Sequence, residues 1–313
     1  MKVMICGGTG LIGRALIDFW LQEGHELIIV SRSPAKVHAY GERKRVQAIS
    51  WSELTHIPEH SQDVDAVVNL AGESINQRWT SMARNRILSS RIIPTRRIAD
   101  WASKLSRKLP IYISASGISI YGPSETGTFD EMSMARGDDF LTDVIYQWEE
   151  AADRVPADRT IKLRIAPVLA NEGGAYPMIK LPYLLGIGGR IGSGKQPLSW
   201  IHITDMVRLI DFVLYDSIAG VVNASSPEAV TNDDFGRSLA KVYRRKHWMP
   251  VPAAALHILF GEMSSLLLQG QRVYPAKVLE HGFTFQYGTL EKALTELRDS
   301  KKNNSSSLMN ENV

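Results

Sequence analysis

The heptapeptide Gly-Gly-Thr-Gly-Leu-Ile-Gly, which begins at Gly7, restricts the fold of this 313-residue chain more than any other feature. The apolar run 2–6 precedes it and residues 11–23 follow with helical spacing, so the glycines join a strand to a helix. Gly7 permits a tight turn, Gly10 lets a diphosphate approach the backbone, and Gly13 lets the helix pack closely. Free N–H groups at the helix N-terminus would hold the phosphates. The motif predicts a dinucleotide site, and the alternative is a glycine turn in a decayed site.

Apolar runs of strand length alternate with helical patterns along the rest of the chain. Such runs are typical of a parallel sheet covered on both faces, and the alternation predicts a doubly wound α/β fold. The predicted strands are 2–6, 26–30, 65–70, 111–114, 161–165, 200–203 and 220–223. The predicted helices, besides 11–23, are 81–107 with a kink or division at Pro94, 138–152, 204–214, 231–243, 253–260 and 263–269.

The predicted architecture is a Rossmann-type doubly wound parallel sheet with a smaller C-terminal substrate lobe. Residues 1–170 form the dinucleotide-binding domain, and about 198–245 complete its sheet. The glycine-rich segment 171–197 and residues 246–298 form the lobe, because a run of Gly and Pro favours ligand-facing loops. The polar tail 299–313 is expected to be disordered.

Composition restricts the partners. The formal charge of +3 gives no case for binding nucleic acid or an anionic membrane. Cys6 is the single cysteine, so no internal disulfide forms, and its apolar neighbours predict a buried side chain. No apolar stretch approaches the ~18–20 residues of a membrane span, and no signal peptide is visible. We therefore expect a cytoplasmic protein whose partner is a small-molecule substrate, with no nucleic acid and no membrane.

The end of the second strand decides between the two nicotinamide dinucleotides. NAD sites usually place Asp or Glu there to bind the ribose 2′-hydroxyl, whereas this strand ends Ile-Val-Ser31-Arg32-Ser. A guanidinium and a hydroxyl suit a 2′-phosphate, which an acid would repel. The sequence therefore predicts NADP(H), and the alternative is that Arg32 is an ordinary solvated loop residue.

Further motifs carry a family resemblance. Asn69-Leu-Ala-Gly72, Ser114-Ala-Ser-Gly-Ile-Ser-Ile-Tyr-Gly122, Leu163-Arg164 and Trp200-Ile-His-Ile-Thr-Asp205, together with the glycine turn, resemble the extended short-chain dehydrogenase/reductases. A nearer likeness is to an atypical branch called "epimerase family protein", which is NAD-dependent epimerase/dehydratase-like and has a C-terminal module of unknown function. Its marks include Arg78-Trp79, Trp148-Glu149, the segment 189–196 and a module at about 250–298.

The resemblance implies cofactor contacts from the glycine turn, from the tip of the second strand and from segments that follow later strands. The full set is Gly7, Thr9, Gly10, Leu11, Ile12, Gly13, Ser31, Arg32, Leu70, Ala71, Gly72, Glu73, Arg91, Ser114 and Arg164. For Arg91 and Arg164 the alternative is an ion pair on a helix surface or at a strand end. In extended relatives the helix at 81–107 joins a dimer bundle, so the resemblance also allows a homodimer.

The proton-transfer residues of the parent family are missing. That family uses Tyr-x-x-x-Lys with a nearby hydroxyl, and the lysine lowers the pKa of the tyrosine. Aligned on Glu149, the Tyr and Lys positions hold Leu141 and Ile145, and the hydroxyl position, four before Tyr121, holds Gly117. Tyr146 lies nearby but on the wrong side of its helix.

Three hydroxyls at the mouth of the fifth strand are the substitutes that we predict. They are Ser116, Ser119 and Tyr121, and the alternative for each is a strand-end cap or a packing role. His202 is interpreted as a hydrogen-bonded structural histidine, and Lys195 either meets an anionic substrate or is solvated. The eight histidines are scattered along the chain, and no metal site is predicted.

Three functions remain open. The first is an NADP(H)-dependent oxidoreductase or sugar-nucleotide epimerase-like enzyme of unidentified substrate. The second, which the missing Tyr/Lys pair favours, is a non-catalytic NADP(H)-binding module that senses redox state or regulates a partner. The third is a sugar-nucleotide binding protein with vestigial use of the cofactor.

Overall fold

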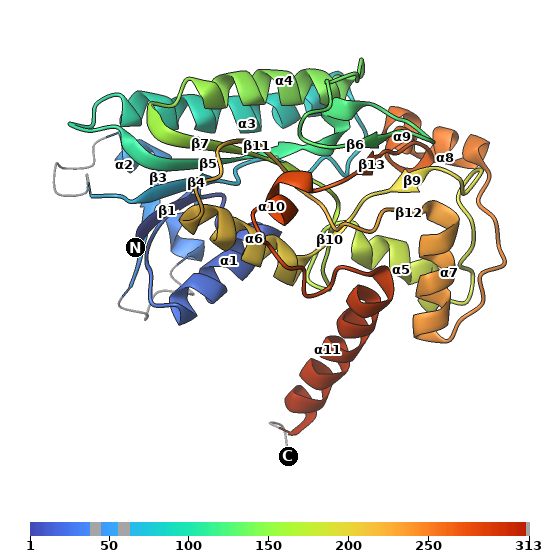
Figure 1. The fold of residues 1–313 in the computed structure, drawn as a ribbon. Helices are drawn as coiled ribbons and strands as arrows, with labels where there is room; N and C mark the ends of the chain where they lie inside the picture. Colours follow the sequence, from blue (N-terminus) through green and yellow to red (C-terminus); the bar gives the residue numbers. More distant parts are fainter. Residues whose placement is uncertain (38–44, 56–62, 311–313) are drawn as a thin grey trace.

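A seven-stranded sheet with the strand order β11-β7-β5-β4-β1-β2-β3 forms the centre of the molecule, and all its neighbouring strands run parallel (Figure 1). The computed structural model describes residues 1–37, 45–55 and 63–310, with 301–310 described by their backbone alone. The strands are β1 Lys2–Cys6, β2 Glu26–Ser31, β3 Val46–Ser50, β4 Ala66–Asn69, β5 Leu109–Gly117, β7 Ala157–Ile165 and β11 Gly220–Ala224. The predicted doubly wound α/β fold is confirmed.

Helices cover both faces of this sheet, as Figure 1 shows. On one face lie α1 Leu11–Gln22, α6 Ile203–Tyr215 and α10 Ala276–Glu280, and on the other α3 Ser81–Ala102 and α4 Phe140–Asp153. The short helix α2 Trp51–Leu54 follows β3. Fully buried side chains such as Leu16, Ile17 and Trp20 of α1 join the apolar residues of β1 and α6 in the larger core. Cys6 is also fully buried, as its neighbours predict.

A second body of helices and short strands carries its own core. The helices α5 Tyr176–Leu184, α7 Asn232–Tyr243 and α11 Leu290–Asn310 pack together around Tyr176, Phe235 and Leu294. Helices α8 Ala253–Phe260 and α9 Ser265–Leu268 follow α7 along the chain. The 3₁₀ turns are η1 Pro34–Lys36, η4 Ile118–Tyr121 and η5 Gly261–Ser264. The short strands form three pairs, which are β6 Thr128–Phe129 with β13 Arg272–Val273, β8 Val168–Leu169 with β10 Ile201–His202, and β9 Pro197–Leu198 with β12 Val230–Thr231.

Several local expectations need correction. The segment 171–197 was expected to form loops, yet it contains helix α5. The sequence does not predict β3, in which Ile49 alone is buried. Pro94 does not divide α3, because the helix packs along the sheet on both sides of the proline. The strand expected at 200–203 is confined to Ile201–His202, since the His202 ring caps the N-terminus of α6.

The last correction concerns the C-terminal tail. Helix α11 continues to Asn310, through a segment for which the composition predicts disorder. Leu290, Ala293 and Leu294 are buried against the second core, so the start of the helix is anchored and later turns can extend it. The expectation for residues 311–313 lies outside the described residues.

The order of the sheet places the site. Strand β1 lies between β2 and β4, so the direction of strand order reverses beside β1. In open parallel sheets, ligands bind beyond the carboxyl ends of the strands at such a reversal. The glycine turn follows β1 directly and therefore occupies this position.

Candidate functional site

The glycine turn packs so tightly that side chains are excluded from it. Gly7 has φ +83°, and a Cβ there would lie 2.7 Å from the carbonyl carbon of Leu70. A Cβ on Gly13 would lie 2.5 Å from the carbonyl oxygen of Gly7. Gly8 is equally restricted, because its Cβ would meet Ile29 at 2.7 Å, and the sequence analysis gave it no role. The first turn of α1 is thus held against the turn and against the end of β4.

The N-terminus of α1 carries no competing group. Helices α3, α4 and α7 are capped by the side chains of Thr80, Asp139 and Thr231. By contrast, α1 begins after Gly10 with no side-chain cap and no acidic residue in its first turn. Its first N–H groups lack intrahelical partners, and together with the helix dipole they favour an anion.

The tip of β2 places a cation beside this turn. Ser31 is buried, and its hydroxyl accepts a hydrogen bond from the Ser33 N–H at 3.2 Å. Arg32 is exposed and makes no ion pair with any described residue. Its charge still lies close enough to help lower the pKa of Glu73, behind the larger effects of hydrogen bonds from Gln77 and Arg86. A free guanidinium therefore lies at the edge where the sequence predicts the 2′-phosphate.

The loop after β4 forms the other wall. Asn69 is buried, and its side chain donates to Thr95 Oγ1 at 2.9 Å and accepts from the Ala71 N–H at 3.2 Å. Glu73 binds Arg86 at 3.1 Å. The predicted contacts Leu70, Ala71 and Gly72 lie in this loop, with Leu70 and Ala71 directly against Gly7.

Arg91 lies under the same loop without a carboxylate partner. Its guanidinium donates to the carbonyl oxygens of Ile87 at 2.8 Å and Glu73 at 3.1 Å, and it stands over the ring of Trp148. Within the described ranges Arg91 makes no salt bridge, so the predicted alternative of a surface ion pair does not hold for it. Burial lowers the pKa of Arg91 while Glu73 opposes the shift, and the guanidinium stays charged at neutral pH.

The ends of β5 and β7 hold a buried polar network. Arg164 donates to both carboxylate oxygens of Glu149, each at 2.9 Å, and Ser116 donates to the same carboxylate at 2.6 Å. The Arg164 guanidinium lies 5.0 Å from the centre of the Tyr121 ring, and Tyr121 donates to Asn223 at 2.8 Å. Burial lowers the pKa of Arg164, but Glu149 outweighs it and raises the pKa overall. Arg164 thus matches the predicted alternative of a strand-end ion pair.

The three predicted catalytic hydroxyls differ in burial and in whether they already form a hydrogen bond within the protein. Ser116 and Tyr121 are buried and donate to Glu149 and Asn223, and burial raises the pKa of Tyr121 although Arg164 opposes the rise. Ser119 is half-buried, and its hydroxyl has no hydrogen-bond partner among the described residues. Ser114 is fully buried and donates to the Ala115 carbonyl at 3.2 Å.

Apolar side chains occupy the two positions at which the sequence analysis placed the Tyr and Lys of the parent family. Leu141 and Ile145 are both buried, and a Cβ on Gly117 would lie 3.1 Å from Ile145. Tyr146 is 48% exposed, which agrees with its predicted direction away from the site. Neither Glu149 nor Asn223 was assigned a role from the sequence. Their partners lie 15 and 102 residues away, so only the fold brings these groups together.

The second body reaches over the glycine turn. A Cβ on Gly174 would lie 3.2 Å from the Leu11 side chain, and Asn76 of the β4 loop contacts Met178 of α5 at 2.9 Å. His202, buried at the start of α6, accepts from the Thr204 N–H and bonds Glu296 at 2.8 Å, as expected of a structural histidine. The predicted site therefore lies between the sheet and this second body.

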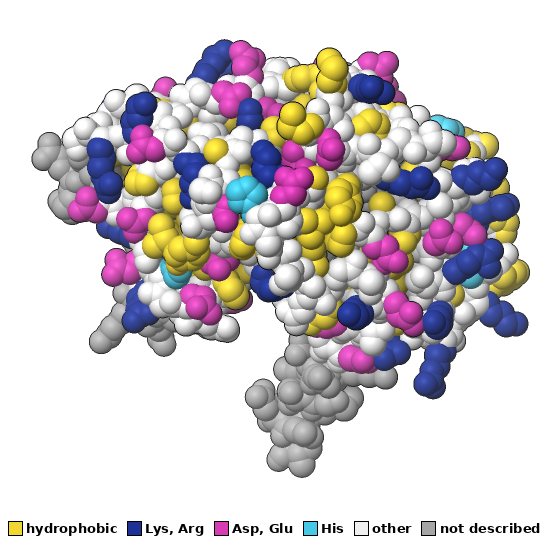
Figure 2. All heavy atoms as spheres, in the orientation of Figure 1, with side chains coloured by type: hydrophobic (Ala, Val, Ile, Leu, Met, Phe, Trp, Pro, Cys, Tyr) yellow, Lys and Arg dark blue, Asp and Glu magenta, His cyan; other side chains and the backbone are white. Residues whose placement is uncertain are grey.

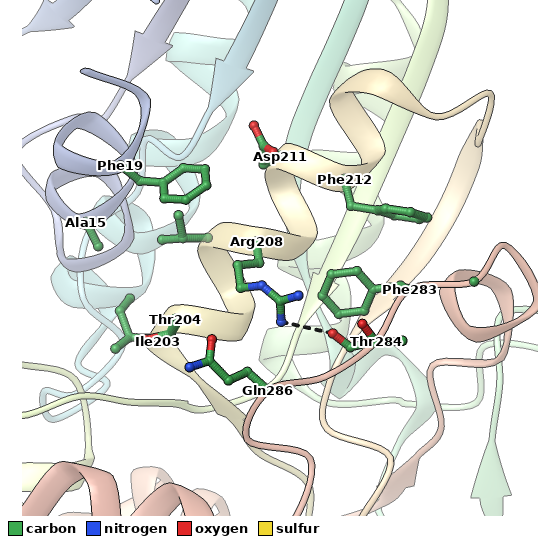
Figure 3. A pocket seen from close by; sticks show the side chains of 12 residues that line it. Ala15, Phe19, Ile203, Thr204, Arg208, Asp211, Phe212, Phe283, Thr284 and Gln286 are labelled. Atoms are coloured by element: carbon green, nitrogen blue, oxygen red, sulfur yellow. Dashed lines mark hydrogen bonds between the residues drawn. The ribbon is translucent and has the colours of Figure 1, made fainter. Parts of the chain in front are cut away.

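A separate groove of about 640 Å³ lies between α1, α6 and the segment 282–286 (Figure 3). None of the predicted site residues lines it. Its arginine, Arg208, is occupied by the Thr284 carbonyl at 2.9 Å and by Asp205 at 3.1 Å. Among the described residues no cluster of three or more His, Cys, Asp or Glu could hold a metal ion, and no helix there is long and apolar enough to span a membrane.

Comparisons with known proteins find relatives that have this arrangement of a dinucleotide-binding sheet and a C-terminal module. Residues 3–138 match the family model "NAD dependent epimerase/dehydratase family", and 251–297 match a domain of unknown function, DUF1731. Epimerase family protein YfhF of Bacillus subtilis (strain 168) is 37% identical, over 96% of this chain and 99% of that protein. Epimerase family protein SDR39U1 of Bos taurus is 35% identical, over 95% and 99%. The crystal structure of human epimerase family protein SDR39U1 (isoform2) with NADPH superposes with TM-score 0.87 at 34% identity, covering 96% of this chain and 99% of that one.

The match to these relatives is full-length, and it includes both the dinucleotide-binding sheet and the C-terminal module of about 250–298 that the sequence indicated. The fold of this chain is that of the extended short-chain dehydrogenase/reductases. The chain belongs to the epimerase family proteins of the NAD-dependent epimerase/dehydratase group, with a C-terminal DUF1731 domain.

Proposed function

We propose that this protein binds NADP(H) at the carboxyl edge of its sheet and uses it in redox chemistry on a small molecule. One observation carries the proposal: an unpaired guanidinium, Arg32, stands beside an uncapped helix N-terminus where NAD sites carry an acid. The human relative that was crystallised with NADPH supports the same cofactor.

The residues present fit that cofactor. The backbone of residues 9–13 would hold the diphosphate, since a Cβ on Gly7 or Gly13 would collide with the turn that presents it. Arg32 and Ser31 would hold the 2′-phosphate, and Arg91 supplies a further positive charge beneath the β4 loop. When bound, the cofactor supplies or accepts a hydride.

Proton transfer would need a different group from that of the parent family. Leu141 and Ile145 cannot move a proton, and the raised pKa of Tyr121 disfavours a tyrosinate. We propose Ser119 as the hydroxyl that meets the substrate, because Ser116 and Tyr121 are already donating to protein acceptors. Those two would shape the floor of the site. The proposal covers oxidoreductase and epimerase-like reactions alike.

The same observations favour a second candidate, a non-catalytic NADP(H)-binding sensor or regulator. Every position of the usual proton-transfer set is apolar or glycine, and two of the three substitute hydroxyls are engaged. Such a protein would bind the cofactor tightly and turn over no substrate.

Replacement of Arg32 tests the cofactor assignment. In Arg32→Asp the preference for NADPH over NADH should fall roughly 10- to 100-fold, because a charge-assisted bond is lost and a repulsive charge is gained. Titration of nucleotide fluorescence measures both affinities. Arg97→Asp, at an exposed position of α3, is the matched control and should leave the ratio unchanged. An unchanged ratio in Arg32→Asp removes this residue from the phosphate site.

Oxidation of NADPH against a panel of aldehydes and ketones separates the two candidates. Turnover on any member, reduced at least tenfold in Ser119→Ala, supports the enzyme and the role of this hydroxyl. Turnover that Ser119→Ala leaves intact removes Ser119 from the proposal. Tight NADPH binding without turnover across the panel supports the sensor.

A further inference from the structure

Four large apolar side chains are exposed on two segments that lie against each other. Leu185, Ile187, Trp248 and Met249 are 66%, 46%, 57% and 37% exposed. The Trp248 indole donates to the Gly186 carbonyl at 2.9 Å, and the backbone N–H groups of Trp248 and Met249 both bond Gly188. These contacts hold together two segments, about sixty residues apart in the chain, that both expose large apolar side chains.

The backbone under these side chains is packed firmly. A Cβ on Gly188 would lie 2.3 Å from the Tyr183 ring, and one on Gly189 would lie 1.9 Å from the Met249 carbonyl. Tyr183 in turn bonds His247 at 2.9 Å and stacks on its ring. The apolar side chains therefore stand outward from a rigid support and are not exposed by local fraying.

The stretches of chain around these two segments, residues 173–204 and 235–261, carry positive charge and no carboxylate. The whole chain has 36 Lys and Arg against 33 Asp and Glu, yet residues 173–204 and 235–261 contain no acid. Exposed cations that make no ion pair with any described residue occur in both segments. They are Arg190, Lys195, Arg244, Arg245 and Lys246. Figure 2 shows Lys and Arg gathered toward the right-hand side, the region of α7 in Figure 1, with some Asp and Glu and a few hydrophobic side chains among them.

We propose that this face, defined by the four apolar residues and the five cations, docks on the surface of an anionic phospholipid membrane. Lys and Arg are attracted to anionic headgroups, while Trp and aliphatic side chains enter the headgroup–acyl boundary. A nucleic acid fits less well, because Leu185, Ile187 and Met249 offer bases neither a stacking plane nor a hydrogen bond. The small net charge of the whole chain does not reflect this excess of cations, and the neighbouring carboxylate, Asp233, is already paired with His247 and Arg237.

Co-sedimentation of the full chain with vesicles tests the charge. Binding is expected to mixed phosphatidylglycerol–phosphatidylcholine vesicles and not to phosphatidylcholine alone, and salt should weaken it. The triple variant Arg244→Gln, Arg245→Gln, Lys246→Gln should bind roughly 100-fold more weakly, at about 1 kcal/mol per charge. Its matched control, Arg14→Gln, Arg96→Gln, Arg97→Gln, removes three exposed charges elsewhere and should bind as the wild type does.

A second set of variants tests the apolar contact. Trp248→Ser should weaken vesicle binding about tenfold with the charge unchanged, whereas Met132→Ser, at a position 88% exposed outside this face, should not. The tryptophan emission of Trp248 can be isolated by subtracting the spectrum of Trp248→Phe from that of the wild type. This difference spectrum should shift to shorter wavelength when anionic vesicles are added. Equal binding to both vesicle types, equal loss in the control triple variant, or binding of an oligonucleotide without binding of vesicles would each overturn the proposal.

Discussion

The Glu149–Arg164 pair shows at the scale of single residues how this site is supported. Both side chains are buried, and the pair is bidentate, so each charge depends on the other for stabilisation. Glu149→Gln should lower the free energy of unfolding by about 3 kcal/mol, because it leaves a buried guanidinium without its counter-charge. Urea unfolding measures the loss. Glu150→Gln, one residue on, removes an exposed pair with Arg154 and should cost about 0.5 kcal/mol or less.

The double variant Glu149→Leu, Arg164→Met separates the two roles considered for Arg164. Replacing both charges by apolar groups should recover most of the lost stability. If Arg164 serves only the pair, the affinity for NADPH recovers as well. A double variant that is stable but binds NADPH poorly would show that Arg164 also contacts the cofactor. Similar losses in Glu149→Gln and Glu150→Gln would contradict the structural importance of the buried pair.

The role of a residue was predictable from the sequence where that role depends on the conformation of the backbone. The spacing of the glycines fixes the turn, and the packing of Gly7 and Gly13 in the structure follows the mechanical reasons given for these two residues. The partner of a side chain was not predictable in the same way. Arg91 and Arg164 looked alike in sequence, yet one contacts carbonyl oxygens and a ring while the other finds a carboxylate. That difference is set by the meeting of α3 and α4 with the strands, which no local pattern encodes.

At the scale of elements, burial explains both the successes and the failures of sequence analysis. Strands β1 and β4 were found because nearly all their residues are apolar and buried on both faces, as the centre of a parallel sheet requires. The edge strand β3 has a single buried residue and therefore no apolar run to reveal it. Helix α3 stays continuous through Pro94 because seven of its residues are buried, and the rule that proline ends a helix does not take the stabilisation from this burial into account.

The junction of α1 and β2 is expected to make the stability of the chain depend on pH. His25 is buried there, stacks on Trp20 and has no partner for Nδ1 among the described residues. Burial lowers the pKa of His25, with Asp211 and Glu23 opposing the shift. Protonation is thus easier in the unfolded chain, so this contribution to stability is complete above the unfolded pKa of about 6.5 and is lost as the pH falls below it.

Replacing His25 should therefore flatten the pH dependence. The melting temperature of the wild type should fall more steeply between about pH 6.5 and 5 than that of His25→Gln, whatever the offset between them at neutral pH. His281→Gln is a suitable control, since His281 is a surface group beside Asp216. Parallel curves for the wild type and His25→Gln would refute the assignment.

At the scale of the whole molecule, the site depends on two bodies that meet over α1. The sequence located the glycine-rich segment 171–197, but it could not show that Gly174 lies on Leu11 or that Asn76 reaches Met178. It also assigned residues 198–245 to completing the sheet, and β11 of that segment does so, whereas α7 packs with α5 and α11. Contacts between distant segments arise from the packing of complete surfaces, and a one-dimensional pattern describes only one surface at a time.

Cofactor binding should consequently stabilise both bodies together. At 100 times its dissociation constant, NADPH should raise the free energy of unfolding by about 2.7 kcal/mol, and the melting temperature of a chain of this length by roughly 4 °C. Amide exchange should slow not only at residues 7–13 but also at 173–185, because that segment covers Leu11 and contacts the β4 loop. In Arg32→Asp the same NADPH concentration should give a smaller shift. Protection confined to residues 7–13 would mean that the second body does not close on the cofactor, and the absence of any thermal shift would exclude the dinucleotide site itself.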